Sequence, residues 1–289
     1  MYLHTINTEL FKLDGGAMFG VVPKAIWNKL VPADENNLCT WAMRLLLIED
    51  GDKLILIDTG IGNKQDAKFF SHYYLDHHNT LNTSLQALGF SKDDVTDVIL
   101  THLHFDHCGG AIARDGDKLV PAFKNAVYWS NERHWQWATN PNDREKASFL
   151  KENILPIKES GQLKFIQTPA NGLEQTGVLG SAVFNKNISL RFVNGHTDMM
   201  MLPQINYNGK TLVYVADLLP SVAHLPLPYV MGYDMFPLTT LNEKKSFLKE
   251  AADNNYNLFF EHDAVNECCS LHHTEKGIRQ KDTFRLSEI

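Results

Sequence analysis

The stretch Thr101-His102-Leu103-His104-Phe105-Asp106-His107-Cys108-Gly109-Gly110 decides how this sequence is interpreted. It places three histidines and one aspartate within six positions, in a chain with 13 histidines among 289 residues. Alternate side chains of an extended strand end point to the same side, so His102 and His104 can converge on one ion. Asp106 and His107 are adjacent and must diverge, which suits two metal ions better than one. Imidazole and carboxylate ligands together suit zinc, manganese, iron or cobalt.

A binuclear centre needs further ligands from elsewhere in the chain. Three candidates each follow a predicted buried strand, where a rigid sheet can hold a ligand in position. They are His196, after the strand at residues 189–193; Asp217, after the strand at residues 211–215; and His262, after the strand at residues 258–260.

Hydrophobic periodicity predicts an α/β protein. Two apolar runs, Cys39–Ile48 and Leu54–Ile57, flank an Asp-Gly turn and predict a β-hairpin. A buried strand at Val95–Leu100 leads directly into the histidine cluster. Other predicted elements are a helix at residues 83–88, a strand at 126–129, a helix at 130–138 with Ser130 as N-cap, strands at 199–207 and 211–215 joined by an Asn208-Gly209 turn, and a helix at 241–254. Because the strands form two sets with helices, we expect two sheets packed face to face in one domain, residues 1–289.

Composition excludes several classes of protein. Hydrophobic residues make up 44% of the chain and charged residues 21%, which is ordinary for a globular protein. A net charge of −7 provides no basic surface for nucleic acid. The N-terminus lacks the pattern of a secretory signal, and the apolar runs are too short to cross a membrane. The four cysteines form no CxxC pair, so we expect a cytoplasmic protein with reduced thiols and no membrane or nucleic-acid partner.

The motifs HLHFDH, GHT, AD and EHD, in this order, resemble the metal-binding motifs of the metallo-β-lactamase superfamily. Asp58-Thr59-Gly60 matches an early aspartate motif of that superfamily, and the resemblance extends from about Gly15 to His262. It implies a four-layer αββα sandwich. The implied ligands are His102, His104 and His196 for a first metal ion, and Asp106, His107 and His262 for a second, with Asp217 as the bridge and Asp58 as the residue that orients a ligand histidine. One departure is GHTDMMM, in which Met200 replaces a histidine that many members of the superfamily have.

A closer resemblance narrows the expected reaction. The segment Leu13–Lys24, and Asp217-Leu218-Leu219-Pro220 with Ala223-His224, are similar to quorum-quenching lactonases of the YtnP type. That resemblance implies opening of N-acyl-homoserine lactones by a hydroxide that bridges two divalent ions, zinc above all. Asp106 and Asp217 would be the catalytic carboxylates, with Asp106 passing a proton to the leaving alkoxide.

The position that holds a substrate-orienting tyrosine in related lactonases is Pro220 here, so another side chain must fill this role. The candidates for binding a small-molecule substrate are Phe19, Trp27, His224, Tyr229 and Tyr233. Trp135 and Trp137 cannot share one helix face, so one of them should be exposed or meet a neighbouring element, for example the second subunit of a homodimer.

Three alternatives to a lactonase remain at this point. A phosphotriester hydrolase would use the same metal centre on phosphorus. A glyoxalase-II-like thioesterase would need a glutathione site, for which no residues stand out. A non-catalytic binding protein would be expected to have lost ligands, whereas all seven positions hold metal-binding residue types.

Overall fold

The computed structural model describes residues 1–168 and 180–289, and its chain divides into two compact units. Unit 1 comprises Met1–Leu10 and Met43–Gln167, and unit 2 comprises Phe11–Ala42 and Thr168–Ile289. Two long strands, β1 (Tyr2–Asp14) and β2 (Leu38–Asp50), continue from one unit into the other. The expectation of a single domain therefore stays a prediction.

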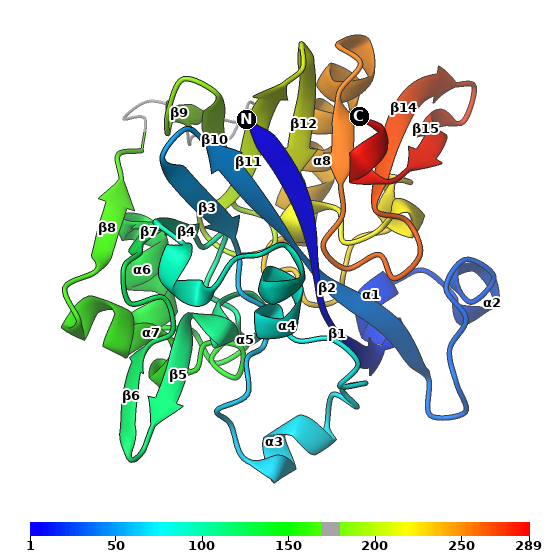
Figure 1. The fold of residues 1–289 in the computed structure, drawn as a ribbon. Coiled ribbons are helices and arrows are strands. Elements are labelled where there is room, and N and C mark those ends of the chain that lie inside the picture. Colours follow the sequence, from blue (N-terminus) through cyan, green and yellow to red (C-terminus); the bar gives the residue numbers. More distant parts are fainter. Residues whose placement is uncertain (169–179) are drawn as a thin grey trace. The chain divides into compact units, whose positions relative to one another are not determined.

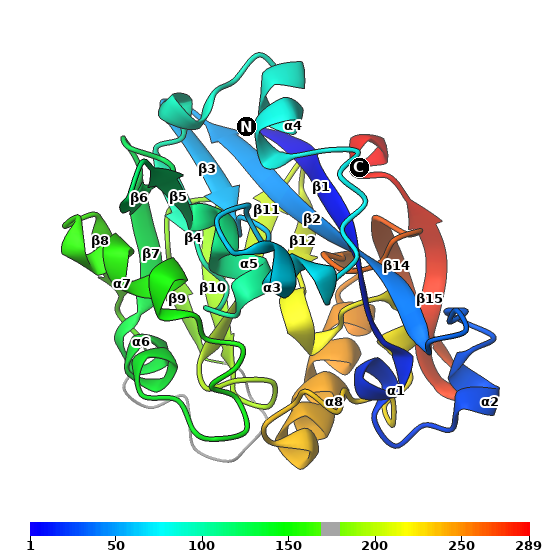
Figure 2. The ribbon, with the colours of Figure 1, turned by 90° about the horizontal axis from the view of Figure 1, so that it is seen from below.

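A largely parallel group of strands forms the centre of unit 1. The sheet has the order β1-β2-β3-β4-β7-β8, and its remaining strands are β3 (Lys53–Ile57), β4 (Asp97–Ile99), β7 (Val127–Asn131) and β8 (Leu163–Ile166). The predicted hairpin is confirmed, because β2 and β3 pair antiparallel around Gly51, whose φ is 69°. From β3 to β8 the neighbouring strands run parallel (Figure 2). Their carboxyl ends consequently lie at the same edge of the sheet.

Short helices and one hairpin complete unit 1. The helices are α3 (Ala67–Ser71), α4 (Leu81–Ala87), α5 (Phe105–Cys108), α6 (Glu132–Thr139) and α7 (Lys151–Glu159), and the hairpin is β5 (Ile112–Asp115) with β6 (Lys118–Pro121). Figure 2 shows α7 beside this hairpin. The N-cap of α6 is Asn131 rather than the predicted Ser130, since the side-chain oxygen of Asn131 accepts the His134 backbone N–H at 2.9 Å. Leu45, Leu56, Val98 and Leu103 belong to the buried core of this unit.

Unit 2 is built on a sheet with the order β15-β14-β13-β12-β11-β10-β9. Its strands are β9 (Ser181–Val183), β10 (Ile188–Val193), β11 (Met200–Tyr207), β12 (Lys210–Tyr214), β13 (Asn257–Phe259), β14 (Cys268–Thr274) and β15 (Gly277–Phe284). All neighbours pair antiparallel except β12 and β13, which are parallel. The Asn208-Gly209 turn is confirmed, with φ of 52° and 73° at its two central residues.

One long helix, α8 (Pro237–Asp253), accompanies this sheet, and Figure 1 shows it beside the hairpin of β14 and β15. It begins four residues before the predicted start, because Pro237 occupies its first turn, where a missing N–H costs nothing. Phe247, Leu248 and Ala251 form its buried side. Two short helices, α1 (Gly15–Phe19) and α2 (Lys24–Trp27), belong to the same unit. No helix in residues 1–168 and 180–289 has the length and apolar character of a membrane span.

Candidate metal centre

The ligand-rich segment of unit 1 starts where its parallel strands end. Ile57 of β3 pairs in register with Ile99 of β4. Asp58 follows directly on β3, and His102 lies three residues beyond Ile99. Asp58 has a φ of 58°, an uncommon value for a residue other than glycine, and its carboxylate is fully buried. Local backbone strain of this kind is retained when the side chain has a specific task.

Asp58 orients two segments of the cluster. Its Oδ1 accepts the Thr101 backbone N–H at 2.7 Å, and its Oδ2 accepts the Thr101 hydroxyl at 2.6 Å. The same Oδ2 lies 3.1 Å from His107 Nδ1. Nδ1 of His107 therefore carries the proton, and Nε2 is left with the lone pair that a metal ion requires. The role implied for Asp58, orienting a histidine that binds metal, stays a prediction to which this contact is relevant.

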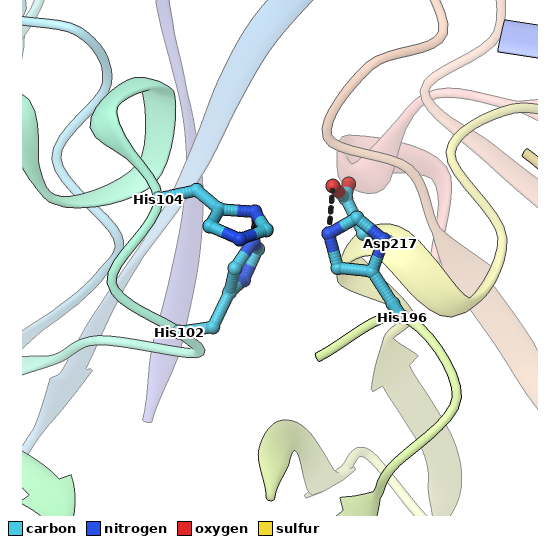
Figure 3. Close-up of side chains that lie close together, drawn as sticks. All are labelled: His102, His104, His196 and Asp217. Carbon is cyan, nitrogen blue, oxygen red and sulfur yellow. Dashed lines mark hydrogen bonds and ion pairs between the residues drawn. The ribbon is translucent and has the colours of Figure 1, made fainter. Parts of the chain in front are cut away.

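His102 and His104 present one nitrogen each to a common point, and Figure 3 shows the two rings side by side. Nδ1 of His102 lies 3.1 Å from the Thr101 hydroxyl oxygen, whose hydrogen is donated to Asp58, so this nitrogen is the donor. Nε2 of His104 lies 3.0 Å from Glu145 and donates to that carboxylate. The two remaining nitrogens, His102 Nε2 and His104 Nδ1, are 3.0 Å apart and both carry lone pairs.

Two lone pairs at this distance repel each other unless a cation lies between them. Nitrogens bound at about 2.1 Å to one ion, with an angle of about 90–110° at the metal, are about 3.0–3.4 Å apart. The separation of 3.0 Å between the two imidazoles therefore fits a shared metal ion. Asp106 and His107 form the other pair, with Asp106 Oδ2 3.9 Å from His107 Nε2.

Sequence reasoning missed Glu145 and His134 in this unit. Glu145 is 2% exposed, and its second oxygen accepts the Trp137 indole N–H at 2.6 Å. His134 accepts the Leu103 backbone N–H at 2.9 Å and so fixes the backbone between the two candidate ligands His102 and His104. Neither residue belongs to a local motif. Only their closeness to the histidine cluster in the folded chain identifies them. Trp137, which cannot share a helix face with Trp135, therefore meets a neighbouring segment of the same chain through Glu145.

Three candidate ligands of unit 2 lie at the same offset from their strands. His196, Asp217 and His262 each come three residues after the end of β10, β12 and β13, respectively. These strands all run in the same direction, and Tyr214 pairs with Phe259 at the parallel junction of β12 and β13. The sheet register therefore brings the three side chains to one edge.

Asp217 connects the two histidines through different oxygens. Its Oδ2 is 3.0 Å from His196 Nε2, drawn as a dashed line in Figure 3, and its Oδ1 is 3.1 Å from His262 Nε2. The outer nitrogens are held by acceptors, since His262 Nδ1 lies 2.8 Å from the Ala42 carbonyl and His196 Nδ1 lies 2.9 Å from Asp234. One carboxylate with a histidine nitrogen beside each oxygen is the arrangement expected of a ligand that bridges two ions.

The protonation of His196 supports this interpretation. Burial lowers the pKa of His196, but the carboxylates of Asp217 and Asp234 outweigh it and raise the pKa to about 10. An imidazole between two carboxylates needs a positive charge, and this charge comes either from a second proton or from a metal ion at Nε2. Asp234 is 1% exposed, lies 38 positions beyond His196, and was not predicted from the sequence.

The loop that carries His196 is fixed from α8. Glu243 is buried and accepts the backbone N–H groups of Asn194 at 2.7 Å and Gly195 at 3.0 Å. Gly195 is required at its position, because a Cβ there would lie 2.2 Å from the Thr240 hydroxyl. Helix α8 thus sets the position of the candidate ligand His196 through the backbone before it.

The substrate-binding candidates differ in their surroundings. Phe19, Trp27 and His224 are fully buried in one stack, with Phe19 4.6 Å from His224 and 5.3 Å from Trp27 between ring centroids. Tyr229 is half-buried and meets Phe19 edge-on at 6.2 Å, whereas Tyr233 is 38% exposed. The stack is part of the core of unit 2, so a substrate role for its three members stays a prediction.

Two further positions singled out in the sequence are buried. Met200, which replaces the second histidine of the family motif, is fully buried at the start of β11 and packs in the core. Cys108 is also fully buried; its thiol contacts the Leu103 carbonyl at 3.2 Å, and burial raises its pKa.

Comparison with known proteins gives a family match over most of the chain. The model of a family described as the metallo-β-lactamase superfamily matches residues 45–262. A probable metallo-hydrolase of Mycobacterium bovis is 32% identical over 155 residues, which are 43% of this chain and 48% of that protein. The chain thus spans about half the length of the curated relatives it matches.

Solved structures resemble the chain over nearly its full length. A probable metal-dependent hydrolase from Staphylococcus aureus superposes with a TM-score of 0.86 and 25% identity, covering 98% of this chain and 96% of that one. AidC, a dizinc quorum-quenching lactonase in complex with a product, superposes with a TM-score of 0.78 and 22% identity, covering 98% and 94%. The predicted α/β class and the fold that the family motifs implied are confirmed.

Proposed function

We propose that this chain, which belongs to the metallo-β-lactamase superfamily, is a metal-dependent hydrolase that opens lactone rings. The observation that carries the proposal is the position of Asp217, with one histidine nitrogen beside each of its two oxygens. The first metal ion would be held by His102, His104, His196 and Asp217, and the second by Asp106, His107, His262 and Asp217. We expect zinc, although manganese, iron or cobalt would accept the same donors.

The residues that surround the ligands prepare these donors for binding. The ligand histidines are held through their outer nitrogens, by Thr101, Glu145, Asp58, Asp234 and the Ala42 carbonyl. Such contacts fix the tautomer and the ring orientation and raise the basicity of the inner nitrogen. When bound, two divalent ions would supply an activated water and polarise the substrate carbonyl.

Lactone opening adds water across the ring ester, breaks the bond between the carbonyl carbon and the ring oxygen, and leaves a carboxylate and an alcohol. We assign to Asp106 the transfer of a proton to the leaving oxygen. Asp106 is 8% exposed and lies on the first turn of α5. This geometry keeps its carboxyl in contact with the cluster while one face stays accessible.

The choice of N-acyl-homoserine lactones as substrates has two supports. The segments Leu13–Lys24 and Asp217–Pro220 are similar to those of quorum-quenching lactonases, and AidC, described as a dizinc lactonase, shares the fold. A cytoplasmic location is part of the proposal, and it agrees with four cysteines that are buried and form no disulfide.

The test is a hydrolysis panel on protein whose metal content has been measured. The panel contains homoserine lactones of several acyl lengths, simple lactones and aryl phosphotriesters. We expect about two ions per chain and lactone turnover, lost in His104→Ala and Asp217→Asn but kept in His78→Ala, which removes an exposed histidine. Turnover of phosphotriesters alone would favour the phosphotriesterase alternative. Near-normal lactone turnover in folded Asp217→Asn would show that the cluster is not the reaction centre.

A further inference from the structure

Unit 2 contains a cavity of about 760 Å³ that is separate from its three ligand residues. Its walls come from the segment before β2, the start of β2, the loop after Asp217, the loop after His262, and β15. The lining includes Val31, Trp41, Pro226, Tyr229, Asp263, Val265 and Arg279. We propose that this cavity is a second binding site, for an apolar molecule that carries a carboxylate.

The walls are suited to an apolar body. Trp41 and Tyr229 supply aromatic surface, and Val31 and Pro226 supply aliphatic surface. At the same cavity Val265 is 87% exposed, an unusual degree of exposure for a large apolar side chain. Small-molecule sites typically have volumes of about 300–1,000 Å³ and mainly apolar walls with a few polar groups. Size and lining both fall in this class.

Arg279 gives the cavity its preference for an anion. It is half-buried on β15, and the one hydrogen bond of its guanidinium runs from Nη1 to the Ile278 carbonyl at 2.7 Å. Among the described residues no carboxylate lies within salt-bridge distance of it. A guanidinium offers five N–H donors in a planar fork that matches a carboxylate. The remaining donors of Arg279 are therefore available to a ligand.

Asp263 also lines the cavity, but its charge is already used by the protein. Its Oδ2 accepts the Val222 backbone N–H at 2.9 Å, and its Oδ1 accepts those of Val265 at 2.9 Å and Asn266 at 2.7 Å. Asp263 is 6% exposed, so little of its carboxylate faces solvent. The guanidinium of Arg279 therefore has N–H donors left for a ligand, whereas the oxygens of Asp263 already accept backbone N–H groups. The cavity favours a carboxylate over an amine for this reason.

The cavity adjoins the backbone that holds one candidate metal ligand. Asp263 directly follows His262, and Trp41 directly precedes Ala42, whose carbonyl lies 2.8 Å from His262 Nδ1. Lactone opening also yields apolar carboxylates, so the product of the proposed reaction belongs to the ligand class of this cavity. That last link rests on the proposed function, whereas the binding site itself does not.

The experiment measures binding of octanoate to the metal-loaded protein by calorimetry, with octanamide and octylamine as neutral and cationic counterparts. We expect octanoate to bind best, and Arg279→Gln to weaken its binding about tenfold or more, because a hydrogen bond to a charged group is lost. Lys281→Gln, a change of an exposed cation on the same strand that does not line the cavity, should leave octanoate affinity unchanged.

A carboxylate can also bind at a metal ion, and Arg279→Gln separates the two sites because metal binding would persist in that variant. Equal octanoate affinity in wild type and Arg279→Gln would overturn the proposal, as would octylamine binding as well as octanoate. Val265→Glu provides an independent variant, since a carboxylate at the cavity should repel octanoate and lower its affinity. The measurement needs no turnover, so it can succeed even if the lactone panel fails.

Discussion

Acidification should destabilise this protein through one histidine of the buried stack. His224 is fully buried; its Nε2 lies 2.9 Å from the Met18 carbonyl and its Nδ1 lies 2.8 Å from the Ser221 hydroxyl. Nε2 donates to the carbonyl, and Nδ1 accepts from the hydroxyl. A second proton on Nδ1 would force the Ser221 hydroxyl to rotate from donor to acceptor and would place a charge against Phe19 in the buried stack. Burial lowers the pKa of His224 from 6.5 to about 3.

The sign of the effect follows from this direction. In the unfolded chain the imidazole takes up a proton below about pH 6.5, whereas in the folded chain it stays neutral down to about pH 3. The unfolded state therefore binds more protons between these values, and the free energy of unfolding falls as the pH falls. With the two pKa values of 6.5 and about 3, the loss from His224 between pH 7.5 and pH 5 is about 2 kcal/mol.

Urea unfolding of metal-saturated protein between pH 5 and pH 8 measures this contribution of His224 to the free energy of unfolding. We compare wild type with His224→Gln, which removes the titrating group, and with His78→Gln, which removes an exposed histidine. The free energy of unfolding of wild type and of His78→Gln should fall more steeply with acidification than that of His224→Gln, by about 2 kcal/mol over the range. Parallel curves for wild type and His224→Gln would refute the reasoning.

Three further predictions concern a buried carboxylate, a buried lysine and a glycine. Glu145→Gln should weaken metal binding about 10–100-fold, measured by competition with a chelator, because the carboxylate that orients a ligand histidine becomes a neutral amide; unchanged affinity would contradict the role of Glu145. Lys244→Met should lower the free energy of unfolding, measured in urea, by about 1–3 kcal/mol, because the side-chain hydrogen bonds to the carbonyls of residues 226 and 229 are lost. Lys245→Met, which changes an exposed neighbouring lysine, should have little effect. Gly195→Ala should reduce turnover more than it reduces stability, because the added methyl group meets Thr240 and displaces the loop of His196; a variant with normal turnover would mean that this loop adapts freely.

The sequence is sufficient to predict a turn or hairpin when the residues of that turn decide its conformation. The hairpin of β2 and β3 was predicted because apolar runs flank Gly51, and the turn at Asn208-Gly209 because both residues tolerate positive φ. The boundaries of α6 were harder, because Ser130 and Asn131 are both good N-cap residues. The strand β7 pairs with β8 as far as Asn131, so the helix starts one residue later than predicted, and this pairing is a tertiary contact.

In the candidate site the same contrast separates the candidate ligands from the residues that hold them in position. The candidate ligand positions follow from the sequence, since histidine and aspartate after predicted strands form a recognisable pattern; their role as ligands stays a prediction. Asp234, Glu145 and Glu243 were not predictable, because each acts on a residue 38 to 49 positions away and lies in no motif. The burial of Phe19 and His224 was likewise hidden, since an aromatic side chain near a binding motif suits a pocket wall and a core equally well.

The equal offset of His196, Asp217 and His262 from their strands bears on how this chain tolerates evolutionary change. Their spacing along the edge of the sheet is set by the hydrogen-bond ladders of β10 to β13. The connection from β12 to β13 is under a second constraint, because it carries Asp234 and Glu243, which hold His196 and its loop. Sequence drift that leaves these ladders and these two carboxylates intact can then change the surface of the protein and leave the candidate ligands in place.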